Sequence, residues 1–150
     1  MLRQIFYSFS MLILAMTVFS SCSKNETVSQ TEDLSGTWSI TGIQSNRAYD
    51  WDGDGRQETD ILGTYTACDR DIVLSFEQGG FGRISEGCNA PFVNFNWQLS
   101  GNRLDMQIPS GDLNLDLLQF NSTTLRGTDN IQVNGDNFQI TYTLTRRQRG

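Results

Sequence analysis

The stretch Leu34-Ser35-Gly36-Thr37-Trp38 opens the part of the chain that we expect to fold. It places a small residue and a large indole directly before a series of short segments in which apolar and polar residues alternate. Alternation with a period of two indicates β-strands that bury one face. We therefore predict a single all-β domain over residues 34–147.

The clearest alternation lies in two segments joined by the turn Gly101-Asn102. Their apolar residues are Val93, Phe95, Trp97, Leu99, Leu104, Met106 and Ile108. If Gly101 and Asn102 form a two-residue loop, Leu99 faces Leu104, and both apolar sets lie on one side of the hairpin. The same reasoning at Gly135-Asp136 predicts a hairpin in which Val133 faces Phe138.

Further strands are predicted over residues 36–43, 71–76, 81–86, 113–120 and 123–127. Short turns join about eight antiparallel strands, apart from one long early loop. A closed up-and-down barrel covers the apolar face of such strands and leaves no exposed edge. An open sandwich is the alternative. In the barrel the last strand lies beside the first, and Arg146 would point inward near Trp38.

Gly36-Thr37-Trp38 followed by Arg146 on the last strand resembles the lipocalin pattern, in which an arginine packs across the tryptophan at the closed end of the barrel. The resemblance covers residues 34–146 and is to the lipocalin-like domains of bacterial lipoproteins. It implies a binding protein with a small hydrophobic ligand. Gly87-Cys88-Asn89 also resembles the META type of periplasmic lipoprotein module.

Residues 1–21 are similar to a secretion signal. Arg3 precedes an apolar run over residues 5–19, which is shorter than the roughly 20 apolar residues of a membrane-spanning helix. Ser20-Ser21-Cys22 resembles the lipobox of bacterial lipoproteins, which implies lipid modification of Cys22. A plain signal peptide is the alternative. We expect an exported lipoprotein of the cell envelope, anchored in the outer membrane and facing the periplasm or the surface.

Residues 22–33 are polar and lack aromatic side chains, which predicts a flexible tether between the lipid and the domain. The chain has 11 basic and 17 acidic residues and a net charge of -6, so a nucleic-acid partner is not expected. We expect a monomer whose partner is the membrane.

Histidine is missing from the sequence, which excludes imidazole acid-base chemistry and histidine-ligated metals. We therefore do not expect an enzyme, although the carboxylates Asp69, Asp71 and Glu86 keep acid-base catalysis as an alternative. Cys68 and Cys88 lie almost symmetrically about the predicted turn Gln78-Gly79-Gly80. In an oxidising compartment they are expected to form a disulfide, worth about 3 kcal/mol.

The long early loop, residues 50–60, carries five carboxylates against one arginine and resembles the D-x-D-x-D-G calcium loop. Ile61 replaces the glutamate that an EF-hand needs, so a compact extracellular calcium loop is expected instead. Its predicted ligands are the carboxylates of Asp50, Asp52, Asp54 and Glu58, the backbone carbonyl of Arg56, and Asp60 as an accessory group. The predicted affinity is weak, on the order of 0.1 to 1 mM. A solvated turn is the alternative.

Two functions follow from these features. The lipocalin resemblance implies a membrane-anchored binding protein with a structural calcium ion. The many bulky residues at inward positions instead favour a structural or inhibitory module whose barrel is filled. The volume of the barrel interior distinguishes the two.

Overall fold

The computed structural model describes residues 33–148. The predicted signal over residues 1–21, the acylation site Cys22 and tether residues 23–32 lie outside the described residues. Among the described residues, no helix is both long and apolar enough to pass through a membrane.

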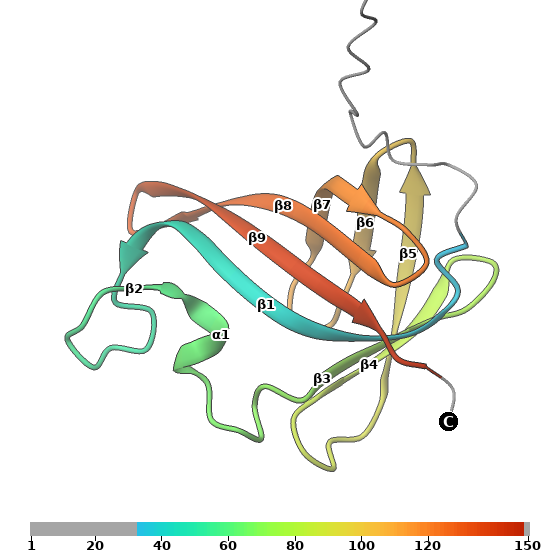
Figure 1. Cartoon of the computed structure of the whole chain (residues 1–150), viewed down its shortest axis with the longest axis horizontal. Helices are drawn as coiled ribbons and strands as arrows, with labels where there is room; N and C mark the ends of the chain where they lie inside the picture. Colours follow the sequence, from blue (N-terminus) through green and yellow to red (C-terminus); the bar gives the residue numbers. More distant parts are fainter. Residues whose placement is uncertain (1–32, 149–150) are drawn as a thin grey trace, which may run out of the picture.

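The described chain folds into nine strands and one short helix, as Figure 1 shows. In order they are β1 (Gly36–Tyr49), β2 (Glu58–Asp60), α1 (Ile61–Thr64), β3 (Ile72–Phe76), β4 (Phe81–Glu86), β5 (Val93–Ser100), β6 (Arg103–Gln107), β7 (Leu113–Phe120), β8 (Thr124–Val133) and β9 (Asp136–Arg146).

The sheet closes on itself because β1 pairs with both β3 and β9. All pairings are antiparallel, and each strand from β3 to β9 lies beside the next one in the sequence. β1 and β9 run side by side in Figure 1. The predicted eight-stranded up-and-down barrel is therefore confirmed, and the open sandwich is wrong. β2 is a three-residue addition that pairs with the far half of β1.

The hairpin at Gly101-Asn102 has the predicted register. Ser100 pairs with Arg103, and Leu99 pairs with Leu104. The apolar residues of β5 and β6 consequently share the inward face of the barrel.

The register predicted for the last hairpin is wrong by two residues. The turn consists of Asn134 and Gly135, so Val133 pairs with Asp136, and Phe138 pairs with Ile131. Both turn residues have positive φ, 51° and 89°. A type I′ turn requires positive φ at both central positions, and asparagine followed by glycine meets that requirement best. A shift of two residues leaves the same side chains facing inward.

The predicted strand over 36–43 is too short, because β1 continues to Tyr49. The strand predicted over 123–127 likewise continues to Val133. The extensions were missed because polar residues near the ends of these strands interrupt the alternation of apolar and polar residues. The long connection also contains helix α1, which is too short for a periodic pattern; it contributes Ile61 and Leu62 to the core.

The barrel interior is filled by side chains from its own strands. Nine large side chains are less than 2% exposed: Trp38, Leu74, Phe76, Leu104, Met106, Leu115, Leu125, Ile140 and Leu144. An eight-stranded barrel has an interior that side chains can fill or that can hold one small ligand, and in this barrel side chains occupy it. The packed core therefore holds the strands as a rigid platform for the loops and the outer surface.

Candidate functional site

The acidic loop is fixed to the barrel at both of its ends by Trp51. The indole Nε1 donates a hydrogen bond to the backbone oxygen of Glu58 at 3.0 Å. The Trp51 ring also packs against Tyr49 and Phe138, with ring centroids 5.0 and 5.1 Å away. The segment between Trp51 and Glu58 is thus a closed loop on an aromatic base.

Hydrogen bonds inside the loop turn its backbone around the carboxylate of Asp50. Oδ1 of Asp50 accepts from the amide of Gly53 at 2.8 Å, and Oδ2 accepts from the amide of Gly55 at 3.0 Å. Gly53 and Gly55 have φ of 78° and 88°, a conformation that glycine adopts without strain. The two glycines therefore let the loop close tightly.

Three carboxylates converge within this loop. Asp50, Asp52 and Glu58 each present one oxygen, and these oxygens lie within 4.8 Å of one another. Calcium–oxygen distances are about 2.3 to 2.6 Å, so oxygens on one ion lie no more than about 5 Å apart. The spacing of the three oxygens therefore suits a single calcium ion.

The electrostatics of Glu58 reflect this crowding. Its pKa is raised above the ordinary value of 4.5, first by burial and then by the charges of Asp54, Asp52 and Asp50. Oε2 of Glu58 is buried and has no hydrogen-bond partner among the described residues. None of the ion pairs among residues 33–148 involves Asp50, Asp52 or Glu58. A bound cation would relieve this repulsion.

The other predicted ligands lie outside the group of three carboxylates. Oδ1 of Asp54 accepts from the amide of Arg56 at 2.8 Å. Asp60 caps helix α1, because its Oδ1 accepts from the amide of Gly63 at 3.1 Å. Sequence spacing alone did not reveal this cap, since it depends on a four-residue helix.

The closed end of the barrel combines Trp38, Arg146 and the chain just before β1. Trp38 pairs with Arg146 in the sheet, and the guanidinium carbon lies 4.4 Å from the centre of the Trp38 ring. The guanidinium also donates to the backbone oxygen of Ser35 at 2.7 Å and to that of Asp33. The indole Nε1 donates to the backbone oxygen of Leu34 at 3.0 Å.

Gly36 lies where these groups meet. A Cβ at this position would stand 2.8 Å from Nη1 of Arg146, and φ is 134°. A side chain here would therefore displace the guanidinium. Nearby, hydrogen bonds from Ser35 and then the charge of Arg146 lower the pKa of Asp33 below its ordinary value of 3.8.

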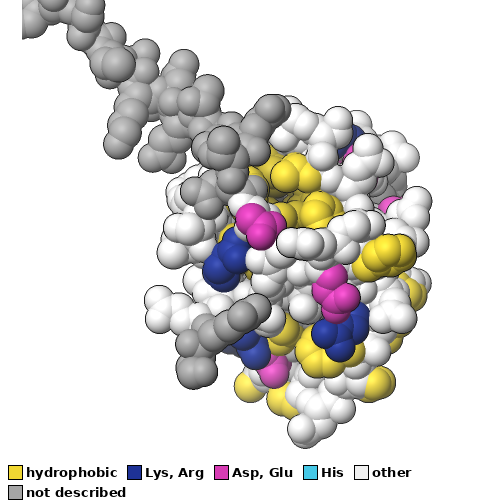
Figure 2. All heavy atoms as spheres, turned by 90° about the vertical axis from the view of Figure 1, so that its right-hand side faces the viewer, with side chains coloured by type: hydrophobic (Ala, Val, Ile, Leu, Met, Phe, Trp, Pro, Cys, Tyr) yellow, Lys and Arg dark blue, Asp and Glu magenta, His cyan; other side chains and the backbone are white. Residues whose placement is uncertain are grey.

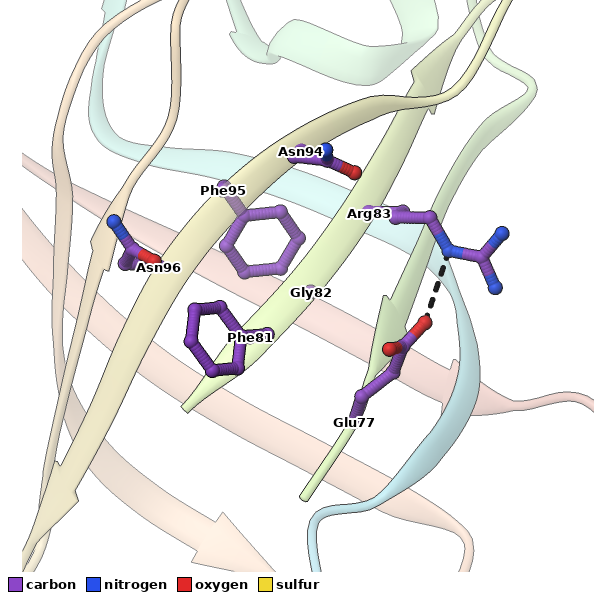
Figure 3. Close-up of a pocket in the computed structure, with 7 residues that line it drawn as sticks. All are labelled: Glu77, Phe81, Gly82, Arg83, Asn94, Phe95 and Asn96. Atoms are coloured by element: carbon purple, nitrogen blue, oxygen red, sulfur yellow. Dashed lines mark hydrogen bonds and ion pairs between the residues drawn. The ribbon is translucent and has the colours of Figure 1, made fainter. Parts of the chain in front are cut away.

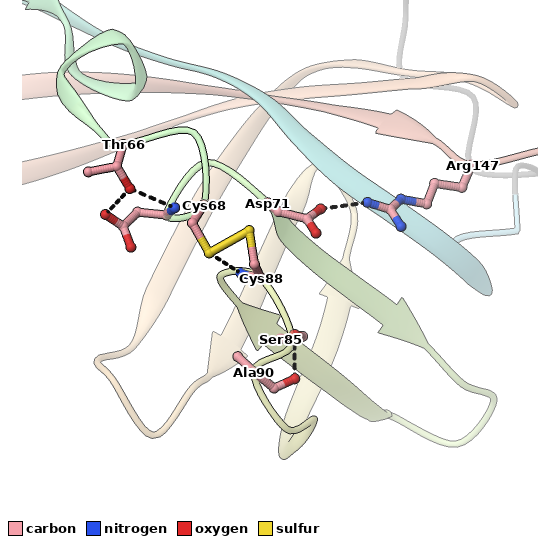
Figure 4. Close-up of a disulfide and its surroundings, with 8 residues drawn as sticks. Thr66, Cys68, Asp71, Ser85, Cys88, Ala90 and Arg147 are labelled. Carbon is pink, nitrogen blue, oxygen red and sulfur yellow. Dashed lines mark hydrogen bonds and ion pairs between the residues drawn. A yellow bond between two sulfur atoms is a disulfide. The ribbon is translucent and has the colours of Figure 1, made fainter.

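The predicted disulfide between Cys68 and Cys88 is confirmed (Figure 4). Its two Cα atoms are 4.9 Å apart, and it joins the turn before β3 to the turn after β4. An ion pair of 2.9 Å between Arg147 and Asp71 lies near it and links the end of β9 to the start of β3. The two links attach the end of the long connection to the barrel.

Two adjoining pockets lie on the outer surface of the sheet. The first, of about 410 Å³, lies over β4 and β5 and is drawn in Figure 3; its lining residues are Glu77, Phe81, Gly82, Arg83, Asn94, Phe95 and Asn96. The second, of about 470 Å³, lies over β5, β6 and β7 and shares Asn96 with the first. Sequence analysis missed both, because their residues come from separate strands and follow no motif.

Comparison with known proteins assigns no family to the chain. A scan against protein-family models gives no match, and a search of the curated proteins gives none either. Function is therefore inferred from the barrel, the acidic loop and the outer surface.

Proposed function

We propose that this protein is a lipid-anchored module that acts through its outer surface and loops, and that it does not carry a hydrophobic ligand inside the barrel. The packed interior is the observation that carries this proposal, since its largest side chains are less than 2% exposed. Pockets for small molecules typically measure about 300 to 1,000 Å³. The two pockets of that size described above lie on the outer surface.

A dye that fluoresces in apolar cavities tests the proposal. The mature chain should give no enhancement that a fatty acid displaces. Leu118→Ala, which changes an exposed position and leaves the interior intact, serves as the control and should behave as the parent does. One-to-one dye binding by the parent chain, with displacement by fatty acid, would instead establish the hydrophobic carrier.

We further propose that the acidic loop binds a structural calcium ion through Asp50, Asp52 and Glu58. Asp54 and the carbonyl of Arg56 complete the coordination after a small adjustment, and Asp60 remains the helix cap. The convergence of three carboxylate oxygens and the raised pKa of Glu58 support this site. The ion would order the loop without taking part in a reaction.

Terbium luminescence provides a direct test, because Tb³⁺ replaces Ca²⁺ and is excited through a nearby indole. Terbium emission should appear on titration with the parent chain and should be displaced by Ca²⁺. It should be lost in Asp52→Asn and, through loss of the antenna, in Trp51→Phe. Emission that persists in Asp52→Asn would place the metal elsewhere.

The anchor is proposed from the sequence and lies outside the described residues. Acylation of Cys22 by more than one chain would hold the protein at the membrane, since a single chain binds only marginally. The Cys68–Cys88 disulfide is consistent with export to an oxidising compartment. Membrane fractionation and intact mass of the parent and of Cys22→Ser test this: the parent should carry lipid, and the variant should become soluble. If the parent carries no lipid, Cys22 is not acylated, and residues 1–21 are instead a plain signal peptide.

A further inference from the structure

The outer surface of β4 to β7 carries five uncharged amide side chains, and we name this surface the amide face. Its members are Phe81, Arg83, Asn94, Asn96, Gln98, Gln107 and Asn114, all of which line the two pockets. The register places them in rows across the strands. Phe81 lies opposite Asn96, which lies opposite Gln107. A neighbouring row joins Gln98 through Asp105 to Asn114.

The amides of this face are available to a ligand. Its side-chain hydrogen bonds join Arg83 to Glu77, and Arg103 to Asp105 and Asp116. The five amide side chains take no part in these bonds. Each offers two donor hydrogens and an acceptor oxygen. The face therefore presents donors and acceptors side by side in fixed rows.

The charges on the face are largely paired with one another. Arg83 and Glu77 are 3.0 Å apart, and Arg103 lies 2.9 Å from Asp105 and 3.3 Å from Asp116. Asp112 at the edge of the second pocket adds a further negative charge. Acidic and basic side chains also lie next to each other on the surface shown in Figure 2. A phosphate or another polyanion finds no cluster of free cations here, so the face suits a neutral ligand.

Two exposed aromatic rings accompany the amides. Phe81 is 62% exposed and Phe92 is 53% exposed, and the guanidinium of Arg83 lies 5.7 Å from the Phe92 ring centre. The backbone of Phe81 is held in place, because its oxygen accepts a 2.7 Å hydrogen bond from the Trp97 indole. An exposed ring on a rigid strand, such as that of Phe81 on β4, provides a flat apolar surface at little cost in conformational entropy.

We propose that the amide face binds a neutral oligosaccharide. Amide side chains match pairs of neighbouring hydroxyl groups, which also donate and accept together, and the Phe81 ring offers a surface for the C–H groups of a sugar ring. The four strands span about 14 Å at a spacing of 4.7 to 4.9 Å, which is longer than one sugar ring. A short stretch of a glycan chain, lying across the strands, is the expected ligand.

This inference rests on the proposed function, in which the module acts through its outer surface. The mature chain is tested on an array of neutral glycans that includes cello-, xylo-, manno-, malto- and chito-oligosaccharides, followed by titration calorimetry with the best hexasaccharide. Phe81→Ala and Asn96→Ala should each weaken binding at least 10-fold. Leu118→Ala replaces an exposed apolar residue of β7 that lines neither pocket, and Asn130→Ala replaces an exposed amide of β8. Both variants should bind as the parent does.

Thermal melts check that all four variants remain folded, as expected for exposed positions. If no neutral glycan binds, if only anionic glycans bind, or if the control variants lose as much affinity as Phe81→Ala and Asn96→Ala, the inference is wrong. Dye binding inside the barrel of the same preparation would refute the proposed function separately, so the two failures are distinguishable.

Discussion

The closed end of the barrel and the acidic loop handle charge in opposite ways. At the closed end, the Arg146 guanidinium lies over the Trp38 ring and donates to two backbone oxygens of the preceding chain. In the acidic loop, Asp50, Asp52 and Glu58 face one another, and the pKa of Glu58 is raised. At the closed end the Arg146 guanidinium is held by groups of its own chain, although its Nε is buried without a hydrogen-bond partner among the described residues. The acidic loop, by our proposal, would gain stability from an added cation.

This difference separates residues that hold the fold together from residues that we propose to bind an ion. A charge that lies against an aromatic ring and donates to fixed backbone oxygens, as that of Arg146 does, is held by the fold itself and does not depend on an added ligand. Carboxylates that repel one another reduce stability until a ligand neutralises them. Stability should therefore depend on side-chain packing at the closed end and on solution composition at the loop. The predictions below test this contrast, beginning with the largest expected effect.

Removing the indole of Trp38 should break the closed end. Trp38→Ala deletes a fully buried side chain and the surface on which Arg146 packs, so we expect a loss of about 3 to 5 kcal/mol in the free energy of unfolding. Urea denaturation measures it, with Leu118→Ala at an exposed position as the control. A loss below about 1 kcal/mol would contradict the role of this residue in the core.

Removing the disulfide should have the next largest effect. The double variant Cys68→Ser/Cys88→Ser frees the chain segment between residues 20 positions apart, and the free energy of unfolding should fall by about 3 kcal/mol. Denaturation of the oxidised parent and of the variant, both in calcium and in chelator, gives the value. Equal stability of parent and variant would show that the bridge does not constrain the unfolded chain.

Calcium should stabilise the acidic loop and leave the closed end unaffected. At about 100 times its dissociation constant, an ion that binds only the folded state adds roughly 2.7 kcal/mol. Melting temperatures in Ca²⁺, Mg²⁺ and chelator should show a calcium-dependent rise in the parent that is lost in Asp52→Asn. Arg146→Lys, which alters the closed end, should keep the rise. If calcium does not change the melting temperature of the parent, the loop is a solvated turn and not a calcium site.

The smallest expected effect is on the pH dependence of stability, which should have opposite signs for the acidic loop and for the closed end of the barrel. The pKa of Glu58 is raised in the folded state, so its charge is destabilising, and stability should increase as pH falls through that raised value toward 4.5. The pKa of Asp33 is lowered, so its contribution is present above 3.8 and is lost as pH falls below that value.

Stability curves of Glu58→Gln and Asp33→Asn between pH 3 and 7, taken in chelator, separate the two contributions. Glu58→Gln should remove the increase in the free energy of unfolding that the parent shows as pH falls from neutral toward 4.5. Asp33→Asn should remove part of the decrease in that free energy as pH falls below 3.8. With calcium present the ion favours the charged form of Glu58, so the gain should disappear in the parent. Identical slopes for both variants would contradict the contrast between the two ends.

Period-two patterns predicted the barrel because inward residues such as Leu104 and Leu144 determine both the strands and their buried face. The same patterns could not fix the last hairpin, since turns at Asn134-Gly135 and Gly135-Asp136 put the same side chains inside. Only the dihedral requirement of the turn distinguishes the two. Strand length at the end of β1 was also hidden, because its exposed polar residues carry no alternation.

The candidate sites were predictable to the extent that they are local in sequence. Asp50, Asp52 and Glu58 lie close together along one loop, so their spacing was informative. Asp60 was predicted as an accessory group of the same site, and in the structure its carboxylate caps a helix that the sequence did not indicate. Phe81, Asn96 and Asn114 come from three strands, and only the register of the folded sheet brings them onto one face.

The pairing of β1 with β9 also has a consequence for the order of folding. Contacts in this pair, such as that between Trp38 and Arg146, join residues 108 positions apart (146 − 38). Contacts between distant residues form late and slow the overall folding rate. We therefore expect β1 and β9 to pair only after the hairpins from β3 to β8 have assembled. Until β9 arrives, β1 keeps an unpaired edge, so the period of greatest risk of aggregation precedes the last step of folding.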